Sequence, residues 1–159
     1  MDEAGARPFL QRAVALAAEH SADGRNGPFG AVVTRNGEVV AEGWNQVVAG
    51  NDPTAHAEVV AIRRACDALG VWDLRGCEIH ASCEPCPMCL AAIYWARIDR
   101  IFFAASRHEA AAAGFQDEFL YQELRRGLPE RRIPTRRVEL PEARGLLDNW
   151  LANPRRVAY

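Results

Sequence analysis

Apolar residues recur at helical spacing near the start of the chain and then give way to short extended runs. From residue 9 to about residue 22 they fall every three or four positions, which predicts an amphipathic helix that ends toward Asp23-Gly24. Residues 31–34 form a short apolar run that predicts a strand. Asn36-Gly37 is typical of a tight hairpin turn and leads into a second predicted strand over 39–41.

Helices and strands are predicted to alternate through the rest of the chain. A helix is expected over 59–69, with Thr54 as a cap near its start and Gly70 after its end. The pattern then predicts a buried strand, a helix and a returning strand, over 77–81, 87–96 and 101–104. Beyond residue 118 it is weaker and predicts two helices and one strand, over 119–126, 142–152 and 136–140. This order predicts an α/β architecture in which helices cover a mixed sheet.

Composition restricts the class of protein. At 159 residues, with 49% apolar and 25% charged residues, the chain fits one globular domain over residues 1–159. The formal net charge of −2 gives no overall attraction to nucleic acid or to an anionic membrane. No apolar run approaches the roughly 20 residues that cross a bilayer, and the first residues lack the order of a secretory signal. Five cysteines that include a Cys-x-x-Cys pair favour metal ligation in a reducing compartment, so we expect a cytoplasmic protein.

Two short motifs carry the chemistry of the chain. His56-Ala57-Glu58 supplies an imidazole and a carboxylate, and Pro85-Cys86-Pro87-Met88-Cys89 supplies two thiolates. Three protein ligands, His56, Cys86 and Cys89, leave one position of a tetrahedral zinc ion open, which is typical of catalytic zinc. His-x-Glu followed by Pro-Cys-x-x-Cys is typical of zinc-dependent nucleobase deaminases, so we expect hydrolytic deamination with one Zn²⁺ per subunit.

Helix geometry restricts how these residues reach one metal ion. Residues two apart on a helix point in nearly opposite directions, so His56 and Glu58 require the first turn of a helix that meets the metal end-on. Cys86 and Cys89 are three apart and share a face, and Pro87 suits the first helical position. We therefore expect two helix N-termini to converge on zinc, which lowers the pKa of its bound water toward about 7. Glu58 is expected to take the proton of that water and deliver it to the substrate.

A closed structural zinc site is the alternative interpretation, and it requires a fourth protein ligand. Cys83 is the nearby candidate. A closed site would leave Glu58 without a function. A chain of this length is also large enough to fold without a structural metal ion, so the catalytic interpretation is preferred. Outside that alternative, Cys66, Cys77 and Cys83 are predicted to be small buried apolar residues.

With these residues in view, the chain resembles the cytidine deaminase-like superfamily of zinc-dependent enzymes and, within it, the bacterial guanine deaminase family. The resemblance extends over nearly the whole chain. In the first half it is carried by GPFGAV (27–32), NDPTAHAE (51–58) and SCEPCPMC (82–89), segments that tRNA adenosine deaminases share in part. In the second half it is carried by the more selective IYWAR (93–97) and AGFQD (113–117). It implies a three-layer α/β/α fold with a central mixed sheet of about five strands.

The same resemblance implies hydrolysis of guanine to xanthine and ammonia, with zinc hydroxide attacking C2 of the base. It implies that Asp117 reads the base, because a carboxylate accepts hydrogen bonds from both the 2-amino group and N1–H of guanine. Asp117 is also expected to help protonate the departing ammonia. Further implied contacts are an amide, a backbone N–H and three aromatic rings that enclose the purine, from Asn45, Ala57, Phe29, Trp95 and Tyr159.

Several features leave the substrate open. Gln116 departs from the family pattern, which more often has Asp there, although the implied base contact is the next residue. The arginine-rich stretch 125–137 would suit phosphate binding by a tRNA adenosine deaminase, the main alternative function. We prefer a solvated helix end and loop there, because the chain as a whole is acidic. Guanosine and aminotriazines share the edge that Asp117 would read. A zinc-holding module without activity is a weaker alternative, since no core catalytic position is missing.

The C-terminal segment, from about residue 141 to residue 159, is implied by the resemblance to be a lid over the active site. Its last residues, 154–159, are basic and then aromatic, which suits a cover that shuts out water. The resemblance also implies a homodimer, in which this segment could be exchanged between subunits. The expected partner is a small purine base, and no membrane or nucleic-acid partner is expected.

Overall fold

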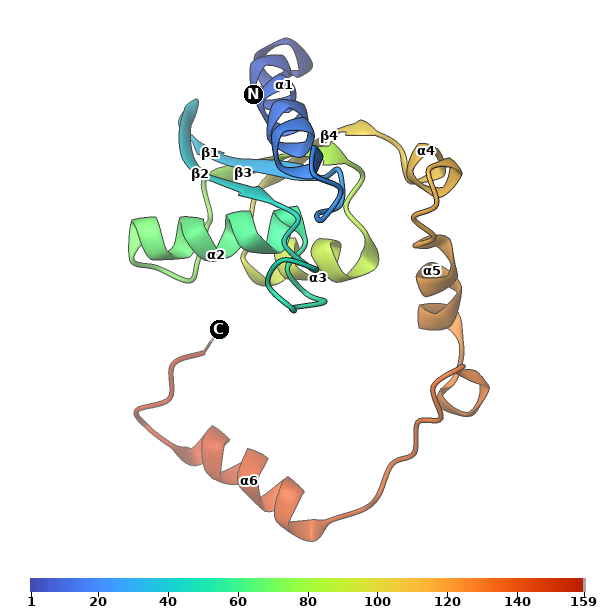
Figure 1. The fold of residues 1–159 in the computed structure, drawn as a ribbon. Helices are drawn as coiled ribbons and strands as arrows, with labels where there is room; N and C mark the ends of the chain where they lie inside the picture. Colours follow the sequence, from blue (N-terminus) through green and yellow to red (C-terminus); the bar gives the residue numbers. More distant parts are fainter. Residues whose placement is uncertain (159) are drawn as a thin grey trace. The chain divides into compact units, whose positions relative to one another are not determined.

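The computed structural model describes residues 1–158. It divides into two compact units, Met1–Tyr121 and Gln122–Tyr159. The first unit carries a four-stranded sheet with helices on both faces, as Figure 1 shows. The prediction of a mixed sheet between helical layers is therefore confirmed.

The sheet has the strand order β2-β1-β3-β4 and is mixed. β1 (Gly30–Arg35) pairs antiparallel with both β2 (Glu38–Trp44) and β3 (Cys77–Cys83), whereas β3 and β4 (Arg100–Ala105) run parallel. The predicted hairpin turn between β1 and β2 is confirmed. Asn36-Gly37 has φ values of 53° and 81°, the left-handed pair that a type I′ turn requires.

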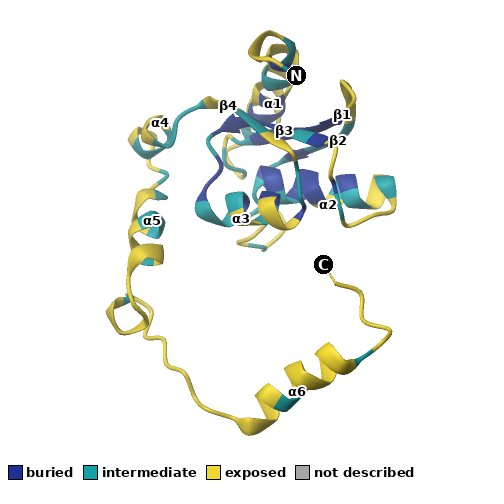
Figure 2. Cartoon of the chain, turned by 180° about the vertical axis from the view of Figure 1, so that it is seen from behind, coloured by how far each residue is buried: buried dark blue, intermediate teal, exposed yellow. Residues whose placement is uncertain are grey.

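Helices cover the two faces of the sheet unequally. α1 (Glu3–Ser21) lies on one face, and α2 (Ala57–Leu69) and α3 (Pro87–Trp95) lie on the other (Figure 1). The buried residues gather in the sheet and on the sides of these helices that face it (Figure 2). The two helices that share a face, α2 and α3, are the ones that begin at the two predicted metal-binding motifs.

Strand residues alternate between the two faces, as the pleat requires. Val32 packs with Leu16 of α1, whereas its neighbours Ala31 and Val33 belong to the larger core under α2. On β2, Gly43 allows a close approach, because a Cβ there would overlap the Ala57 carbonyl oxygen and the Ala61 amide nitrogen. Glycine at this position therefore brings the first turn of α2 directly onto the sheet.

The boundaries of α2 differ from the prediction at one end. Gly70 ends the helix in the left-handed conformation, with φ 67°, as expected. At the other end the N-cap is His56, and Thr54 is not a cap. Thr54 instead donates its backbone N–H and its hydroxyl to Asp52 Oδ1, at 2.8 and 2.6 Å, because it closes the preceding turn. His56 and Glu58 consequently lie in the cap and first turn of α2.

The second half of the chain departs further from the prediction. α4 (Arg107–Ala112) was not predicted, whereas α5 (Glu118–Arg125) and α6 (Pro141–Ala152) confirm two predicted helices. A short 3-10 helix spans Leu128–Glu130. The predicted strand over 136–140 is wrong, since these residues join no described strand. The described sheet therefore has four strands where about five were expected, because an extended segment becomes a strand only when a neighbour satisfies its backbone groups.

The second unit exposes much of its apolar surface (Figure 2). The large apolar residues of α6 are between 49% and 68% exposed, namely Leu146, Leu147, Trp150 and Leu151. Isolated exposed apolar residues are ordinary, but a group on one helix indicates a surface that contacts something else. Among residues 1–158, no helix has both the length and the apolar character needed to traverse a bilayer.

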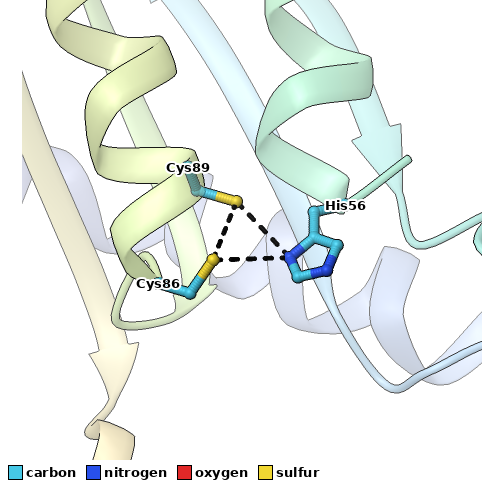
Figure 3. Close-up of side chains that lie close together, drawn as sticks. All are labelled: His56, Cys86 and Cys89. Atoms are coloured by element: carbon cyan, nitrogen blue, oxygen red, sulfur yellow. Dashed lines mark hydrogen bonds between the residues drawn. The ribbon is translucent and has the colours of Figure 1, made fainter. Parts of the chain in front are cut away.

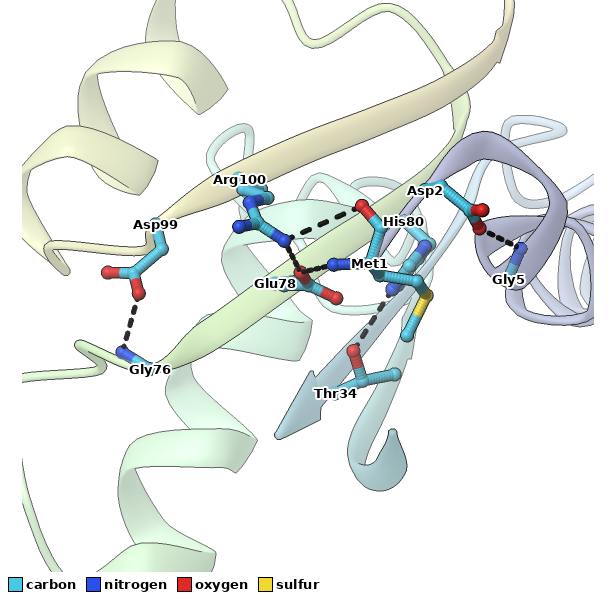
Figure 4. A network of polar contacts seen from close by, with 9 residues as sticks. All are labelled: Met1, Asp2, Gly5, Thr34, Gly76, Glu78, His80, Asp99 and Arg100. Carbon is cyan, nitrogen blue, oxygen red and sulfur yellow. Dashed lines mark hydrogen bonds and ion pairs between the residues drawn. The ribbon is translucent and has the colours of Figure 1, made fainter. Parts of the chain in front are cut away.

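His80 of β3 lies fully buried between α1 and the sheet. Its Nε2 is 3.0 Å from Thr34 Oγ1 (Figure 4), and its ring stacks on Phe102 and contacts Phe9, with ring centroids 5.2 and 4.9 Å apart. Nδ1 is buried and has no hydrogen-bond partner. Burial lowers the pKa of His80 below its usual value, since a charged imidazole loses its water there.

This burial predicts a defined loss of stability in acid. Because the pKa of His80 is depressed in the folded protein, the unfolded chain binds a proton first as the pH falls. The contribution of His80 is complete above the unfolded pKa of about 6.5 and is lost progressively as the pH drops below it. His80→Gln cannot titrate, so its unfolding midpoint in urea should change less between pH 7 and pH 5 than that of the unsubstituted protein. His108→Gln, at an exposed position, is the control. Equal pH dependence of the His80→Gln and unsubstituted proteins would contradict this role.

Candidate active site

The two predicted metal-binding motifs meet at the N-termini of α2 and α3. His56 is the N-cap of α2, Cys86 is the N-cap of α3, and Cys89 lies in the first turn of α3 after Pro87. Figure 3 shows the imidazole and the two thiol groups pointing toward one another. His56 Nδ1 lies 3.6 Å from Cys86 Sγ and 3.5 Å from Cys89 Sγ, and the two sulfur atoms are 3.6 Å apart. These three side chains form a group positioned to bind a metal ion.

The spacing of the three ligand atoms fits tetrahedral zinc. With Zn–S of about 2.3 Å and Zn–N of about 2.0–2.1 Å, tetrahedral angles place two sulfur atoms roughly 3.8 Å apart and sulfur and nitrogen roughly 3.6 Å apart. The observed distances of 3.5–3.6 Å agree with this triangle to within a few tenths of an ångström. Cys83 is not a member of the group, and its Sγ instead lies 3.7 Å from the Ser106 carbonyl oxygen. The described residues therefore offer three ligands rather than a closed set of four.

The electrostatics of the group favour a cation. A hydrogen bond from Cys89, aided by His56, lowers the pKa of Cys86 to about 4, so Cys86 is a thiolate at neutral pH. The pKa of Cys89 is raised, first because it shares its proton with Cys86 and then by burial and the Glu58 carboxylate. Two adjacent thiolates beside a carboxylate repel one another, and a dication between them removes that penalty.

Glu58 lies beside the ligand atoms without belonging to the group. Its side chain is buried, and its Oε2 accepts a hydrogen bond from Cys89 Sγ at 3.4 Å. Burial raises the pKa of Glu58 above that of a free carboxyl, a direction that suits a residue that takes up and releases a proton during the reaction. It occupies the second position of α2, so the end-on geometry expected from the sequence is present.

A pocket of about 380 Å³ opens in front of this group. This volume lies at the small end of the range for small-molecule sites. Of the residues singled out from the sequence, the pocket is lined by Phe29, Asn45, His56, Glu58, Cys86 and Asp117. Asp117 lines the same pocket as His56 and Cys86, and burial raises the pKa of its carboxyl group, with a further contribution from the charge of Cys86.

Asn45 is held in one orientation by the backbone around it. Its Oδ1 accepts hydrogen bonds from the N–H groups of Gly27 and Val47, at 3.2 and 3.3 Å. With the oxygen occupied, the amide NH2 is the group available to a ligand, so Asn45 is oriented as a donor. Phe29 is fixed by an edge contact with Phe115, whose ring centroid is 4.8 Å away.

Two of the remaining predicted contacts, Ala57 and Trp95, do not line the pocket. Ala57 is fully buried in the first turn of α2 and is not among the residues that line the pocket. Trp95 is the last residue of α3, is 67% exposed and does not line the pocket of its own chain. Tyr159 lies outside the described residues. The roles implied for these three residues stay predictions.

Several lining residues were not predicted. Cys83 and Glu84 come directly before the second motif, and this closeness in sequence to the ligands was the available signal. Burial raises the pKa of Cys83 to about 11, so this thiol stays neutral. Phe115, in a segment quoted for the resemblance, and Arg107, which no motif contains, also line the pocket. No sequence signal pointed to Arg107.

Comparison with known proteins agrees with the geometry of the site. Residues 5–105 match the family described as the cytidine and deoxycytidylate deaminase zinc-binding region. The guanine deaminase of Bacillus subtilis (strain 168) is 52% identical over 142 residues, which cover 89% of this chain and 91% of that protein. An X-ray structure of guanine deaminase from Bacillus subtilis matches with a TM-score of 0.94 at 48% identity, covering 100% of this chain and 99% of that one. A tRNA-specific adenosine deaminase of Agrobacterium fabrum is 45% identical over 85 residues, which cover 54% of this chain and 56% of that protein.

Proposed function

We propose that this chain, which belongs to the cytidine and deoxycytidylate deaminase zinc-binding family, hydrolyses guanine to xanthine and ammonia. The observation that carries the proposal is the small pocket that Glu58, Asp117 and two members of the metal-binding group, His56 and Cys86, line together. High identity to a guanine deaminase along most of both chains supports the same substrate.

The proposed chemistry divides the work among a few side chains. His56, Cys86 and Cys89 hold zinc, which when bound lowers the pKa of a water molecule at its fourth position toward about 7. Glu58 takes the proton of the attacking water and passes it to the base. Its burial supports this role, because a carboxylate in a dry site exchanges protons closer to neutral pH.

Recognition of the base is proposed to depend on Asp117 and Asn45. The carboxylate of Asp117 accepts hydrogen bonds from the 2-amino group and N1–H of guanine. It then helps to pass the second proton of the attacking water to the amino group, and the C2–N bond breaks to release ammonia. Adenine presents an acceptor at N1 and leaves a buried carboxylate unpaired, which is a strong source of rejection. The oriented NH2 group of Asn45 donates to an acceptor of the ring, and Phe29 packs against its face. Ala57, Trp95 and Tyr159 are proposed as further contacts.

A tRNA substrate is less well supported. The pocket and its rim carry more carboxylates than cations, with Glu58, Glu84 and Asp117 against Arg107. Such a surface repels the phosphates of a nucleic acid. The similarity to the tRNA-specific enzyme of Agrobacterium fabrum also covers about half of each chain, against about nine-tenths for guanine deaminase.

The assembly and the lid complete the proposal. The exposed apolar residues of α6 support a C-terminal segment, about 141–159, that covers an active site of its own subunit or of a partner in a homodimer. A cover over the pocket would exclude water, which strengthens every charge interaction inside. A cytoplasmic location is part of the same proposal, since the metal-binding thiols require reducing conditions.

The substrate is tested by ammonia release from guanine, guanosine, adenine, cytosine and an aminotriazine. Guanine should be the preferred substrate of the zinc-loaded protein. Glu58→Gln should lower guanine turnover by roughly 10²–10⁴-fold, the usual loss when a general acid–base is removed, with zinc content and fold retained. Glu19→Gln, on the surface of α1, is the matched control and should leave turnover unchanged. Tight, salt-sensitive binding of tRNA without guanine turnover would reverse the assignment.

The lid is tested by deleting the last four residues, 156–159. Turnover should fall by roughly 10- to 100-fold, the scale on which loss of substrate positioning acts, while the thermal unfolding midpoint changes little. A chain of full length with Arg156, the charged side chain among the deleted residues, replaced by Gln separates the effect of charge from that of length. Full activity of the truncated protein would contradict the lid.

A further inference from the structure

Arg107 lines the pocket, yet its guanidinium is engaged by the protein. It is the first residue of α4, and its side chain is 34% exposed. Around it lie Glu84, which follows β3, and Glu118 and Tyr121 of α5. Arg107 is therefore the point at which three separate segments of the first unit meet.

On one side, Arg107 is tied to the segment that enters the metal-binding motif. Its backbone N–H donates to Glu84 Oε2 at 3.1 Å, and its Nη1 lies 3.8 Å from Glu84 Oε1. Glu84 comes two residues before the zinc ligand Cys86 and is itself held by a backbone bond, from its N–H to the Ala105 carbonyl oxygen at 2.8 Å. This side of the contact is fixed to the sheet.

On the other side, Arg107 is tied to α5. Its Nε lies 3.4 Å from Glu118 Oε2, a charge contact without a hydrogen bond, and its guanidinium lies 4.6 Å above the ring of Tyr121. The Tyr121 hydroxyl donates in turn to the Pro85 carbonyl oxygen at 3.4 Å. Both contacts draw the first turns of α5 toward the segment that precedes Cys86.

The loop between α4 and α5 carries Asp117, the residue directly before Glu118. Gly114 turns the chain in the left-handed region, with φ 96°, and Phe115 donates its N–H to the Ala110 carbonyl oxygen at 3.0 Å. Phe115 also contacts Phe29 across the pocket. The carbonyl oxygen of Asp117 accepts a hydrogen bond from the Leu120 N–H of α5 at 3.0 Å, so the position of Asp117 depends on where α5 begins.

We propose that Arg107 is a positioning residue that holds residues 114–117 over the metal centre and thereby aims Asp117 at the base. The inference rests on the proposed function, because it requires Asp117 to read the substrate. Arg107 connects Glu84, which is fixed to the sheet, with Glu118 and Tyr121 of α5. We call these contacts of Arg107 the clamp. Arginine suits the place because one planar cation pairs with two carboxylates and covers an aromatic face.

The surrounding charge argues against a direct contact between Arg107 and an anionic part of the substrate. Glu84 and Glu118 together carry two negative charges beside one guanidinium. An anion at this point would meet a net negative field and displace existing pairs. The clamp therefore predicts an effect on neutral guanine through Asp117, not a preference for phosphorylated substrates.

The test is a double-mutant cycle between Arg107 and Asp117 in the zinc-loaded full chain. Arg107→Gln should lower kcat/KM for guanine by roughly 10- to 100-fold, as expected when a substrate contact is displaced by about an ångström. Arg107→Lys, which keeps the charge but not the planar fork, should lie between it and the unsubstituted enzyme. In an Asp117→Asn background the Arg107→Gln effect should largely disappear, because residues that act through one contact are not additive. Arg75→Gln, which breaks an exposed pair with Asp73 outside the pocket, is the matched control and should leave kcat/KM unchanged.

The outcomes separate the clamp from the proposed function. No guanine turnover by the unsubstituted enzyme refutes the function. Normal turnover with no loss in Arg107→Gln, or an equal loss with and without the Asp117 carboxylate, overturns the clamp. Zinc content and the thermal unfolding midpoint are measured for each variant. If Arg107→Gln does not fold, Arg107→Lys and Glu118→Gln replace it in the test, since each weakens the clamp. Each should lower kcat/KM for guanine when residue 117 is Asp and leave it unchanged in the Asp117→Asn background.

Discussion

The convergence of two helix N-termini on one point is the constraint on which the rest of the structure depends. α2 and α3 lie on the same face of the sheet, and each begins with a metal ligand in extended backbone, His56 and Cys86. Both arrive there because of how the sheet is built. Gly43 lets α2 rest against β2, and the strand before α3 is held between β1 and β4. The positive ends of the helices favour the thiolates, and so the same arrangement prepares the charge balance that zinc requires.

The metal centre and the specificity of the pocket come from different parts of the chain. The ligands and Glu58 belong to the sheet and its two adjacent helices, which are rigidly packed. Asp117 and Phe115 belong to a loop between short helices that contribute no buried residue to the core. A loop with so little packing needs polar contacts at its ends to stay in place, and the role proposed for Arg107 is to provide one through Glu118, the residue directly after the loop. This division explains how one catalytic centre could serve different bases through changes in the loop.

Much of the first half was predictable from the sequence, because its signals are local. Apolar spacing placed α2, α3 and the strands, and the offset between His56 and Glu58 required an end-on helix. The Thr54 cap was wrong because Asp52 competes for its hydroxyl, a contact that helix-capping rules do not anticipate. The strand over 136–140 failed because strand formation depends on a distant partner. The role of Arg107 could not be predicted, since its two charged partners, Glu84 and Glu118, are 23 and 11 residues away in the sequence and no periodicity links them.

The proposed catalysis requires zinc that is held by three side chains and left open to water, with Glu58 beside it but unbound. X-ray absorption at the zinc K-edge of the zinc-loaded protein measures this coordination. We expect two sulfur ligands at about 2.3 Å and two nitrogen or oxygen ligands at about 2.0–2.1 Å, and a spectrum that Glu58→Gln leaves unchanged. A third sulfur ligand, supplied by Cys83, would make the site closed and structural and would contradict an open catalytic zinc.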